Sequence, residues 1–272
     1  MSGGVGGTRP DGPLVGRGAV VTCAGRGIGA AIARVIAEAG ASVVLSARTT
    51  DDVERVAASI RAWGGRAWGV TCDVTDEASV RALGGAARGH LGEVDILVNN
   101  AGDALSAPLA KTTLAEWNRM LAVNATGVFL CTREFAPAMA ERRRGRIVTI
   151  ASTAGLHGGK YIGAYAAAKH AAIGLTKSTA LEFAGRGVTA NAVCPGYADT
   201  PMTERTIANV EKRTGLGRAA ALAAILEAGG QKRLVTPEEV AAEVRRLALD
   251  GAAGITGQTI VINGIDGETR PR

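Results

Sequence analysis

The chain has 272 residues, of which 47% are apolar, and its formal net charge is +6. This length and apolar share suit one large α/β domain with a substantial core, and they argue against a disordered or fibrous chain. The basic residues are dispersed, and the one dense run is Arg142-Arg143-Arg144. It precedes an apolar segment, so we interpret it as a solvated turn and expect no nucleic-acid partner.

Four cysteines, Cys23, Cys72, Cys131 and Cys194, are far apart and form no Cys-x-x-Cys pair. Free thiols in a reducing compartment explain this spacing better than disulfides or a zinc site, so we expect no metal. The glycine-rich start lacks the apolar core of a signal peptide, and no run of about 18 apolar residues follows. We therefore expect a soluble, cytoplasmic protein without a membrane partner.

Short apolar runs alternate with longer amphipathic segments along most of the chain. We expect strands at 19–22, 42–45, 67–72, 95–98, 146–151, 188–193 and 259–262, and helices at 28–39, 52–63, 77–90, 114–140, 164–183 and 237–249. This alternation predicts an α/β fold, a doubly wound Rossmann-type parallel sheet of about seven strands, in a single domain over 18–266. We interpret 1–17 as a flexible N-terminal tail and 267–272 as a C-terminal tail.

A long insertion interrupts the alternation after the strand at 188–193. Residues 200–233 contain two helix-like stretches, 207–213 and 218–228, in an irregular position. An insertion of this length at a sheet edge commonly covers a site, so we interpret 200–233 as a helical substrate lid. A pair of helices that contacts another subunit is the alternative.

The first predicted strand leads into a glycine-rich turn, Thr22-Cys23-Ala24-Gly25-Arg26-Gly27-Ile28-Gly29, which opens a helix. Such a turn lets backbone N–H groups approach a pyrophosphate at the helix N-terminus. The second strand ends in Ala47-Arg48, where an acidic residue would bind a ribose 2′-hydroxyl. Arg48 and Arg26 can instead bind a 2′-phosphate, so the sequence favours NADP over NAD. Simple solvation of both arginines is the alternative.

The pair Tyr165 and Lys169 is the candidate for acid–base chemistry. Their i, i+4 spacing places a phenol and an ammonium on one helix face. A nearby cation favours the phenolate, so we expect Lys169 to lower the pKa of Tyr165 toward the working pH. Ser152 follows a predicted strand, at the edge where ligands bind in such sheets, and could polarise a substrate carbonyl.

The order and spacing of these motifs resemble the short-chain dehydrogenases/reductases, over roughly residues 18–264. Within that family the chain is most similar to 3-oxoacyl-thioester and polyketide ketoreductases. The resemblance is carried by Thr22…Gly27-Ile28-Gly29, Asp73-Val74, Asn99-Asn100-Ala101-Gly102, Asn124, Ser152, Tyr165-x-x-x-Lys169 and Pro195-Gly196…Thr200.

The resemblance implies a catalytic set and a set of cofactor contacts. The catalytic residues are Asn124, Ser152, Tyr165 and Lys169, with Asn124 holding a water that links Lys169 to solvent. When Arg26 and Arg48 from the preceding argument are included, the expected cofactor contacts are as follows: Thr22, Arg26, Gly27, Ile28, Gly29, Arg48, Asp73, Val74, Asn100, Ala101, Gly102, Tyr165, Lys169, Pro195, Gly196 and Thr200. Family members are commonly tetramers, so the resemblance also implies a homotetramer.

One departure concerns the residue after Thr22. The family usually has glycine where this chain has Cys23. A side chain there could crowd the turn or the phosphate. Because the later glycines are present, we expect a modified turn that still binds its cofactor.

Three functions are compatible with these residues. The first is NADPH-dependent reduction of a ketone, on a small molecule or a CoA- or carrier-protein-bound thioester, with Tyr165 as general acid. The second is NAD-dependent oxidation of a secondary alcohol, against which Arg48 argues. The third, of another class, is a cofactor-binding protein without turnover, against which the complete catalytic set argues.

Overall fold

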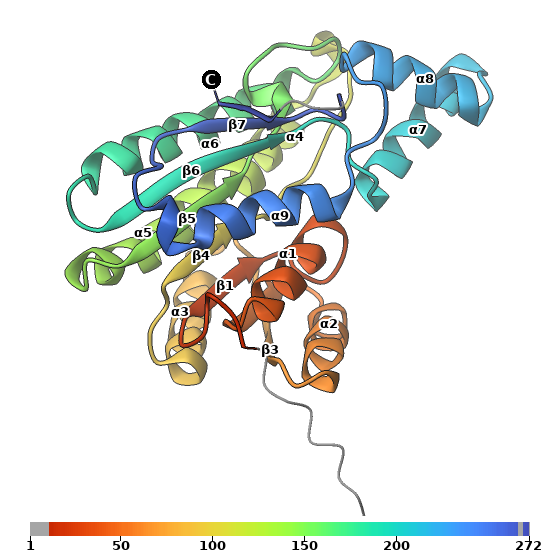
Figure 1. Ribbon diagram of the computed structural model, residues 1–272. Helices are drawn as coiled ribbons and strands as arrows, with labels where there is room; N and C mark the ends of the chain where they lie inside the picture. The colour runs from red at the N-terminus through yellow and green to blue at the C-terminus, as the bar shows by residue number, and fades with distance from the viewer. Residues whose placement is uncertain (1–10, 266–268, 272) are drawn as a thin grey trace, which may run out of the picture.

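The computed structural model describes residues 11–265 and 269–271. One sheet crosses the molecule in the order β3-β2-β1-β4-β5-β6-β7-β8, and β1 to β7 are parallel (Figure 1). The strands are β1 (Gly18–Thr22), β2 (Ser42–Ala47), β3 (Arg66–Thr71), β4 (Ile96–Asn99), β5 (Gly145–Ile150), β6 (Val188–Pro195), β7 (Thr259–Ile262) and β8 (Thr269–Pro271). The predicted doubly wound parallel sheet is confirmed.

Helices cover both faces of this sheet. They are α1 (Gly27–Glu38), α2 (Thr50–Ala62), α3 (Glu77–Leu91), α4 (Leu114–Leu121), α5 (Gly127–Glu141), α6 (Gly163–Glu182), α7 (Pro201–Thr214), α8 (Arg218–Ala228) and α9 (Pro237–Ala248). The apolar faces of α1, α2 and α9 pack on one side of the sheet, and those of α3, α5 and α6 pack on the other. The central strands β1, β4, β5 and β6 are therefore almost entirely buried, which explains their mostly apolar sequences, whereas β3 at the edge is partly exposed.

Both ends of the chain differ from the predicted tails. Residues 11–17 form a turn in which Leu14 is 1% exposed and donates its backbone N–H to Ala39 O at 2.8 Å. The prediction of a flexible tail is wrong for this part, because one buried leucine is enough to anchor a segment without a periodic face. Residues 1–10 of that tail lie outside the described residues. At the other end, β8 pairs antiparallel with β7 in a segment we had interpreted as a tail.

The predicted helix over 114–140 is interrupted. A π-helical turn, Ala122–Thr126, separates α4 from α5 and contains the buried Asn124. Single π turns inside helices are frequent at functional sites. Apolar periodicity does not reveal such a turn, because the segments on either side remain helical.

The strand order reverses between β1 and β4, which lie side by side although β2 and β3 intervene in the sequence. At such a point the loops from the carboxyl ends of the two strands diverge and leave a crevice for a ligand. The glycine-rich turn and the loop after β4 both leave the sheet here. Among the described residues, no helix is both long enough and apolar enough to cross a membrane.

Candidate active site

The glycine-rich turn leaves room for an anion at the start of α1. Arg26 precedes the helix without capping it, and the first turn contains no acidic side chain, so its N–H groups have no side-chain acceptor. Gly27 has a φ of 52°, and a Cβ on Gly29 would lie 2.4 Å from Asn100 Nδ2. Only glycine fits at position 29. The backbone N–H groups at the start of α1 are suited to bind a pyrophosphate.

Thr22 holds the loop after β4 against this turn. Its hydroxyl donates to Val98 O at 3.3 Å and accepts from the N–H groups of Asn100 and Ala101 at 2.9 and 3.0 Å. The Asn100 side chain donates back to Thr22 O at 2.9 Å and to Cys23 O at 3.1 Å. These five hydrogen bonds fix the turn after β1 and the loop after β4 to one another, and both border the crevice.

Two exposed arginines lie at the predicted 2′-phosphate position. Burial raises the pKa of the Cys23 thiol, and the charges of Arg26 and Arg48 oppose this rise. Hydrogen bonds from Thr75 hold the pKa of Asp73 below its usual value, and Arg48 contributes. Arg48 therefore lies near enough to both the turn and Asp73 to act on them electrostatically.

Cys23 has a backbone conformation that favours glycine. Its φ is 52°, in the left-handed region that costs a residue with a Cβ about 1–2 kcal/mol. The turn accommodates the side chain in this conformation, and its effect on cofactor binding stays a prediction. The departure from the family pattern therefore introduces local strain and leaves the crevice in place.

The remaining predicted contacts lie around the same crevice. A Cβ on Gly27 would lie 3.4 Å from the Thr200 side chain, so the turn after β6 faces the glycine-rich turn. Val74 packs against Gly127 of α5, where a Cβ would lie 2.7 Å from Val74 Cγ2. Pro195 is the last residue of β6, and Gly196 packs against the Gln231 side chain. Ile28 is partly buried and packs against the hydrophobic core.

Ser152, Tyr165 and Lys169 come together at the carboxyl edge of the sheet. Ser152 follows β5, and its Oγ accepts from the Ala154 N–H at 3.1 Å, so its own proton can point elsewhere. Tyr165 and Lys169 lie one turn apart on α6, with Lys169 Nζ 5.9 Å from the centre of the tyrosine ring. The sequence prediction that these three residues share one site is supported by this arrangement.

The expected effect of Lys169 on Tyr165 is wrong in this structure. Burial raises the pKa of Tyr165 to about 12, while the Ser152 hydroxyl acts in the opposite direction. Burial also lowers the pKa of Lys169 to about 8. Desolvation of the phenolate therefore sets the direction of the shift, and Tyr165 keeps its proton at neutral pH.

Asn124 lies next to Lys169. A Cβ on Gly102 would be 3.1 Å from Asn124 Oδ1 and 3.3 Å from Lys169 Nζ. Both groups therefore lie close to Gly102, where a larger residue would crowd them. Lys169 Nζ donates to Ile150 O at 3.0 Å. The lysine ammonium is thus fixed by a carbonyl at the end of β5, and Asn124 lies next to it.

The groups that orient Asn124 were not among the predicted site residues. Asn124 Nδ2 donates to the carbonyls of Asp103 and Met120, both at 3.0 Å, and its Oδ1 accepts from the Asp103 N–H at 3.2 Å. These are backbone groups, which any residue type could supply. No sequence pattern could have identified them.

The segment interpreted as a lid forms α7 and α8, which project from one end of the sheet (Figure 1). The two helices pack on each other through Ile207, Ala221 and Ile225. Two arginines of α7 reach the loop after β4: Arg205 lies 3.9 Å from the Asp103 carboxylate, and Arg213 donates to Ser106 O at 3.0 Å. These contacts hold the lid next to the loop that positions Asn124.

Comparison with known proteins places the chain in a family. Residues 17–211 match the family model described as short chain dehydrogenase. The chain is 41% identical over 251 residues to cis-4-hydroxycyclohexanecarboxylate dehydrogenase of Sinomonas cyclohexanicum, covering 91% of this chain and 95% of that protein. It is 39% identical over 249 residues to the 3-oxoacyl-(acyl-carrier-protein) reductase FabG of Escherichia coli, with coverages of 92% and 96%.

A solved structure agrees with these matches. The crystal structure of a variant of actinorhodin polyketide ketoreductase with NADPH superposes with a TM-score of 0.86, at 38% identity, and covers 90% of this chain and 95% of that one. The protein belongs to the short-chain dehydrogenase/reductase family. It is an NAD(P)-dependent oxidoreductase that acts on CH–OH groups, which confirms the predicted enzyme class and excludes the binding-protein alternative.

Proposed function

We propose that this protein is an NADPH-dependent ketoreductase that converts a ketone into a secondary alcohol. The observation that carries the proposal is the arrangement of Tyr165, partly buried on α6, beside Ser152 and Lys169. Reduction consumes a proton at the carbonyl oxygen, so a phenol that keeps its proton at neutral pH suits this direction. NADPH, when bound, supplies the hydride.

The side chains divide the work at the carbonyl. Tyr165 donates its hydroxyl proton to the carbonyl oxygen as negative charge develops there, and Ser152 donates a second hydrogen bond to the same oxygen. The Ser152 hydroxyl is positioned for this by its bond from the Ala154 N–H. Lys169, with its pKa lowered to about 8 by burial, can return a proton to Tyr165 and exchange it with solvent through the Asn124 side.

The preference for NADP rests on charge at the end of β2. Arg48 and Arg26 are both exposed and both act electrostatically on the thiol between them, Cys23. Two guanidinium groups can bind a 2′-phosphate with charge-assisted hydrogen bonds, and Ala47 supplies no carboxylate that would repel it. The structure of the actinorhodin relative, which contains NADPH, supports the same choice.

The proposed substrate is a 3-oxoacyl thioester or a polyketide-like ketone, presented on CoA or a carrier protein or as a small molecule. Two of the similar proteins are named for such substrates, FabG and the actinorhodin ketoreductase. The lid over 200–233 contains six basic and three acidic residues. This excess of positive charge suits the phosphate group of CoA or of a carrier protein.

Oxidation of a secondary alcohol is the second candidate, because cis-4-hydroxycyclohexanecarboxylate dehydrogenase is about as similar as FabG. The two candidates differ in direction and in cofactor. Initial rates with a ketone and NADPH or NADH, and with the alcohol and NADP or NAD, separate them. A kcat/KM that is highest for alcohol with NAD would replace the first proposal by the second.

The deciding experiment is a panel of ketones and 3-oxoacyl thioesters followed by the loss of NADPH absorbance. Tyr165→Phe removes only the hydroxyl and should reduce kcat by at least about 100-fold, the usual contribution of a general acid. Tyr161→Phe is the matched control, because Tyr161 is 59% exposed and lies outside the catalytic set. Activity that survives Tyr165→Phe unchanged would overturn the catalytic assignment.

We further propose a homotetramer in the cytoplasm. Three large apolar side chains are exposed on α4 and α5, Leu114, Trp117 and Phe129, and a subunit contact would cover them. All four cysteines are free thiols, which suits a reducing compartment. Analytical ultracentrifugation tests the assembly, and a Leu114→Lys, Phe129→Lys variant should dissociate it.

A further inference from the structure

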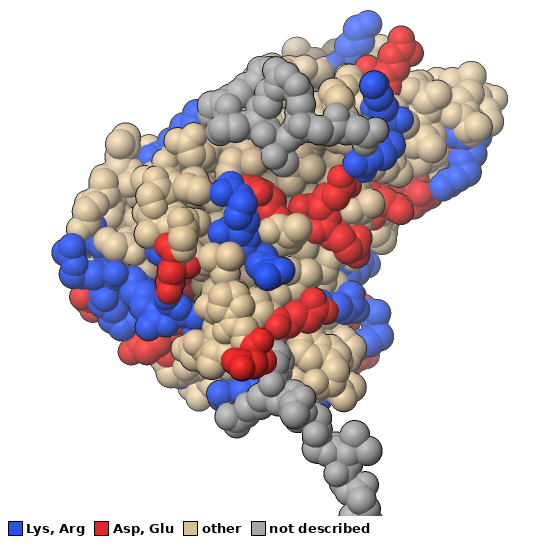
Figure 2. All heavy atoms as spheres, viewed as in Figure 1, with Lys and Arg blue, Asp and Glu red and all other residues tan. Residues whose placement is uncertain are grey.

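A cavity of about 550 Å³ opens at the amino-terminal edge of the sheet, away from the candidate active site. Five arginines line it, and one carboxylate is among its lining residues: Arg17, Arg142, Arg143, Arg144, Arg146 and Asp250. Figure 2 shows basic side chains gathered where α5 ends. A cavity of this size can hold a small phosphorylated molecule.

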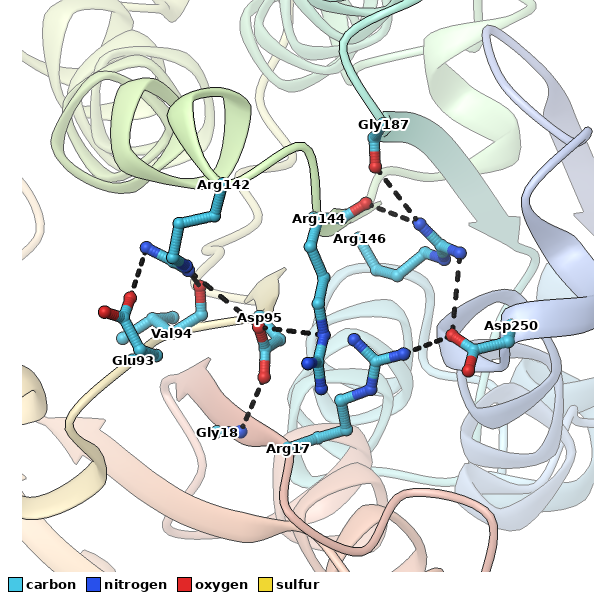
Figure 3. A network of polar contacts seen from close by, with 11 residues as sticks. Arg17, Gly18, Glu93, Val94, Asp95, Arg142, Arg144, Arg146, Gly187 and Asp250 are labelled. Carbon is cyan, nitrogen blue, oxygen red and sulfur yellow. Dashed lines mark hydrogen bonds and ion pairs between the residues drawn. The ribbon is translucent and has the colours of Figure 1, made fainter.

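Two more carboxylates lie beside this cavity and neutralise part of its charge. Arg142 pairs with Glu93 and lies 3.8 Å from Asp95, and Arg144 Nε lies 3.4 Å from the same Asp95 (Figure 3). With Asp250, three carboxylates face five arginines. A surplus of two positive charges therefore remains at one place, in a protein whose net charge is +6.

Arg17 and Arg146 share one carboxylate, while Arg146 also donates to the backbone carbonyls of Gly145, Gly187 and Leu249. Arg17 pairs with Asp250, and Arg146 Nη2 lies 3.9 Å from the same carboxylate. In Figure 3 the guanidinium groups of Arg17 and Arg144 lie between Asp95 and Asp250, and that of Arg146 lies beside Asp250 and Gly187. Like charges held this closely repel one another, and an anion between them would relieve the repulsion.

Arg143 and Arg144 have unused donors. A guanidinium has five N–H groups. Arg143 Nη2 donates to Gly185 O at 2.9 Å, and Arg144 Nε forms only a long ion pair, 3.4 Å, with Asp95. Within residues 11–265 and 269–271, no other acceptor lies within hydrogen-bond distance of either guanidinium. Arg143 also has a φ of 54°, a left-handed conformation that costs energy for a side chain of this kind.

We propose that this cavity binds a phosphate-type polyanion, with Arg143 and Arg144 as its main ligands and Arg17 and Arg146 beside them. Planar guanidinium groups match the oxygens of a phosphate with paired hydrogen bonds. Arg146 lies near the start of β5, whereas Ser152 follows its end. The intervening strand measures about 17 Å at about 3.3 Å per residue. The site is therefore separate from the proposed cofactor crevice and does not depend on the proposed function.

The test uses the full chain saturated with NADPH, so that the cofactor crevice is filled. Inorganic pyrophosphate, titrated by isothermal calorimetry, should bind one site per chain, more weakly as NaCl is raised. Adenosine diphosphate is titrated in parallel. Tighter binding of adenosine diphosphate than of pyrophosphate would indicate a nucleotide ligand, and the reverse would indicate an inorganic one. Arg143→Gln, Arg144→Gln should reduce the affinity at least about tenfold, since charge-assisted bonds are lost.

The control is Arg245→Gln, which removes one exposed charge from α9 and should leave pyrophosphate affinity unchanged. Circular dichroism and NADPH binding verify that each variant is folded. If the double variant does not fold, Arg144→Gln alone serves, because Arg144 makes only the long contact to Asp95. Absence of saturable binding, or binding that persists in the variants but is lost in Arg48→Gln, would overturn the proposal.

Discussion

Replacing Lys169 with methionine is expected to stabilise the folded protein at neutral pH while abolishing its activity. Lys169 is 5% exposed, and burial lowers the pKa of its ammonium from 10.5 to about 8. That difference of about 2.5 pH units corresponds to about 3 kcal/mol of folding free energy, at about 1.4 kcal/mol per unit. Loss of the bond to Ile150 O offsets about 1 kcal/mol, so the net gain is about 2 kcal/mol.

The pH dependence gives this prediction its sign. Between about pH 8 and 10.5 the unfolded chain keeps a proton on Lys169 that the folded chain has released. The free energy of unfolding of the unmodified protein therefore rises with pH across this window. Below it the full cost of the buried charge is present, and above it neither state carries the charge. The advantage of Lys169→Met should be largest below about pH 8 and should disappear as the pH approaches about 10.5.

Urea unfolding without added cofactor, followed by circular dichroism near pH 7 and near pH 10, measures this difference. Lys177→Met is the control, because Lys177 is exposed on the same helix, and it should change the unfolding free energy little at either pH. The reasoning is refuted if Lys169→Met is less stable than the unmodified protein near pH 7. It is equally refuted if the difference in stability does not change with pH.

Three further substitutions test the crevice and the lid. Cys23→Gly should raise the melting temperature, because it removes a left-handed conformation worth about 1 kcal/mol after the entropy of glycine is subtracted. It should keep or tighten NADPH binding in a fluorescence titration, and a large loss of affinity would contradict the prediction. Arg48→Ala should raise the KM for NADPH about tenfold or more and leave that for NADH nearly unchanged, since it removes charge-assisted bonds. Equal effects on both cofactors would contradict a role at the 2′-phosphate. Asp103→Asn removes the ion pairs with Arg119 and Arg205 and should lower kcat several-fold with little change in NADPH affinity, because the loop that orients Asn124 loosens. An unchanged kcat would show that the carboxylate has no part in positioning Asn124.

Most of the fold could be predicted from the residues because its rules are local and periodic. Buried parallel strands favour apolar runs such as Ile96-Leu97-Val98 in β4, and helix starts are marked by capping residues such as Thr236 before α9. The break between α4 and α5 was missed, since a π turn leaves the apolar pattern on either side intact. The anchoring of residues 11–17 was missed because it depends on one leucine.

The sequence by itself determined the sheet, the family and the residue types of the site, because strand ends and glycine turns follow from the order of residues. Only the tertiary structure decided how those groups behave. Lys169 was expected to lower the pKa of the Tyr165 phenol, yet burial raises it to about 12. Desolvation depends on every atom packed around a group. Spacing along one helix gives the distance between two charges and contains no information about the water excluded from them.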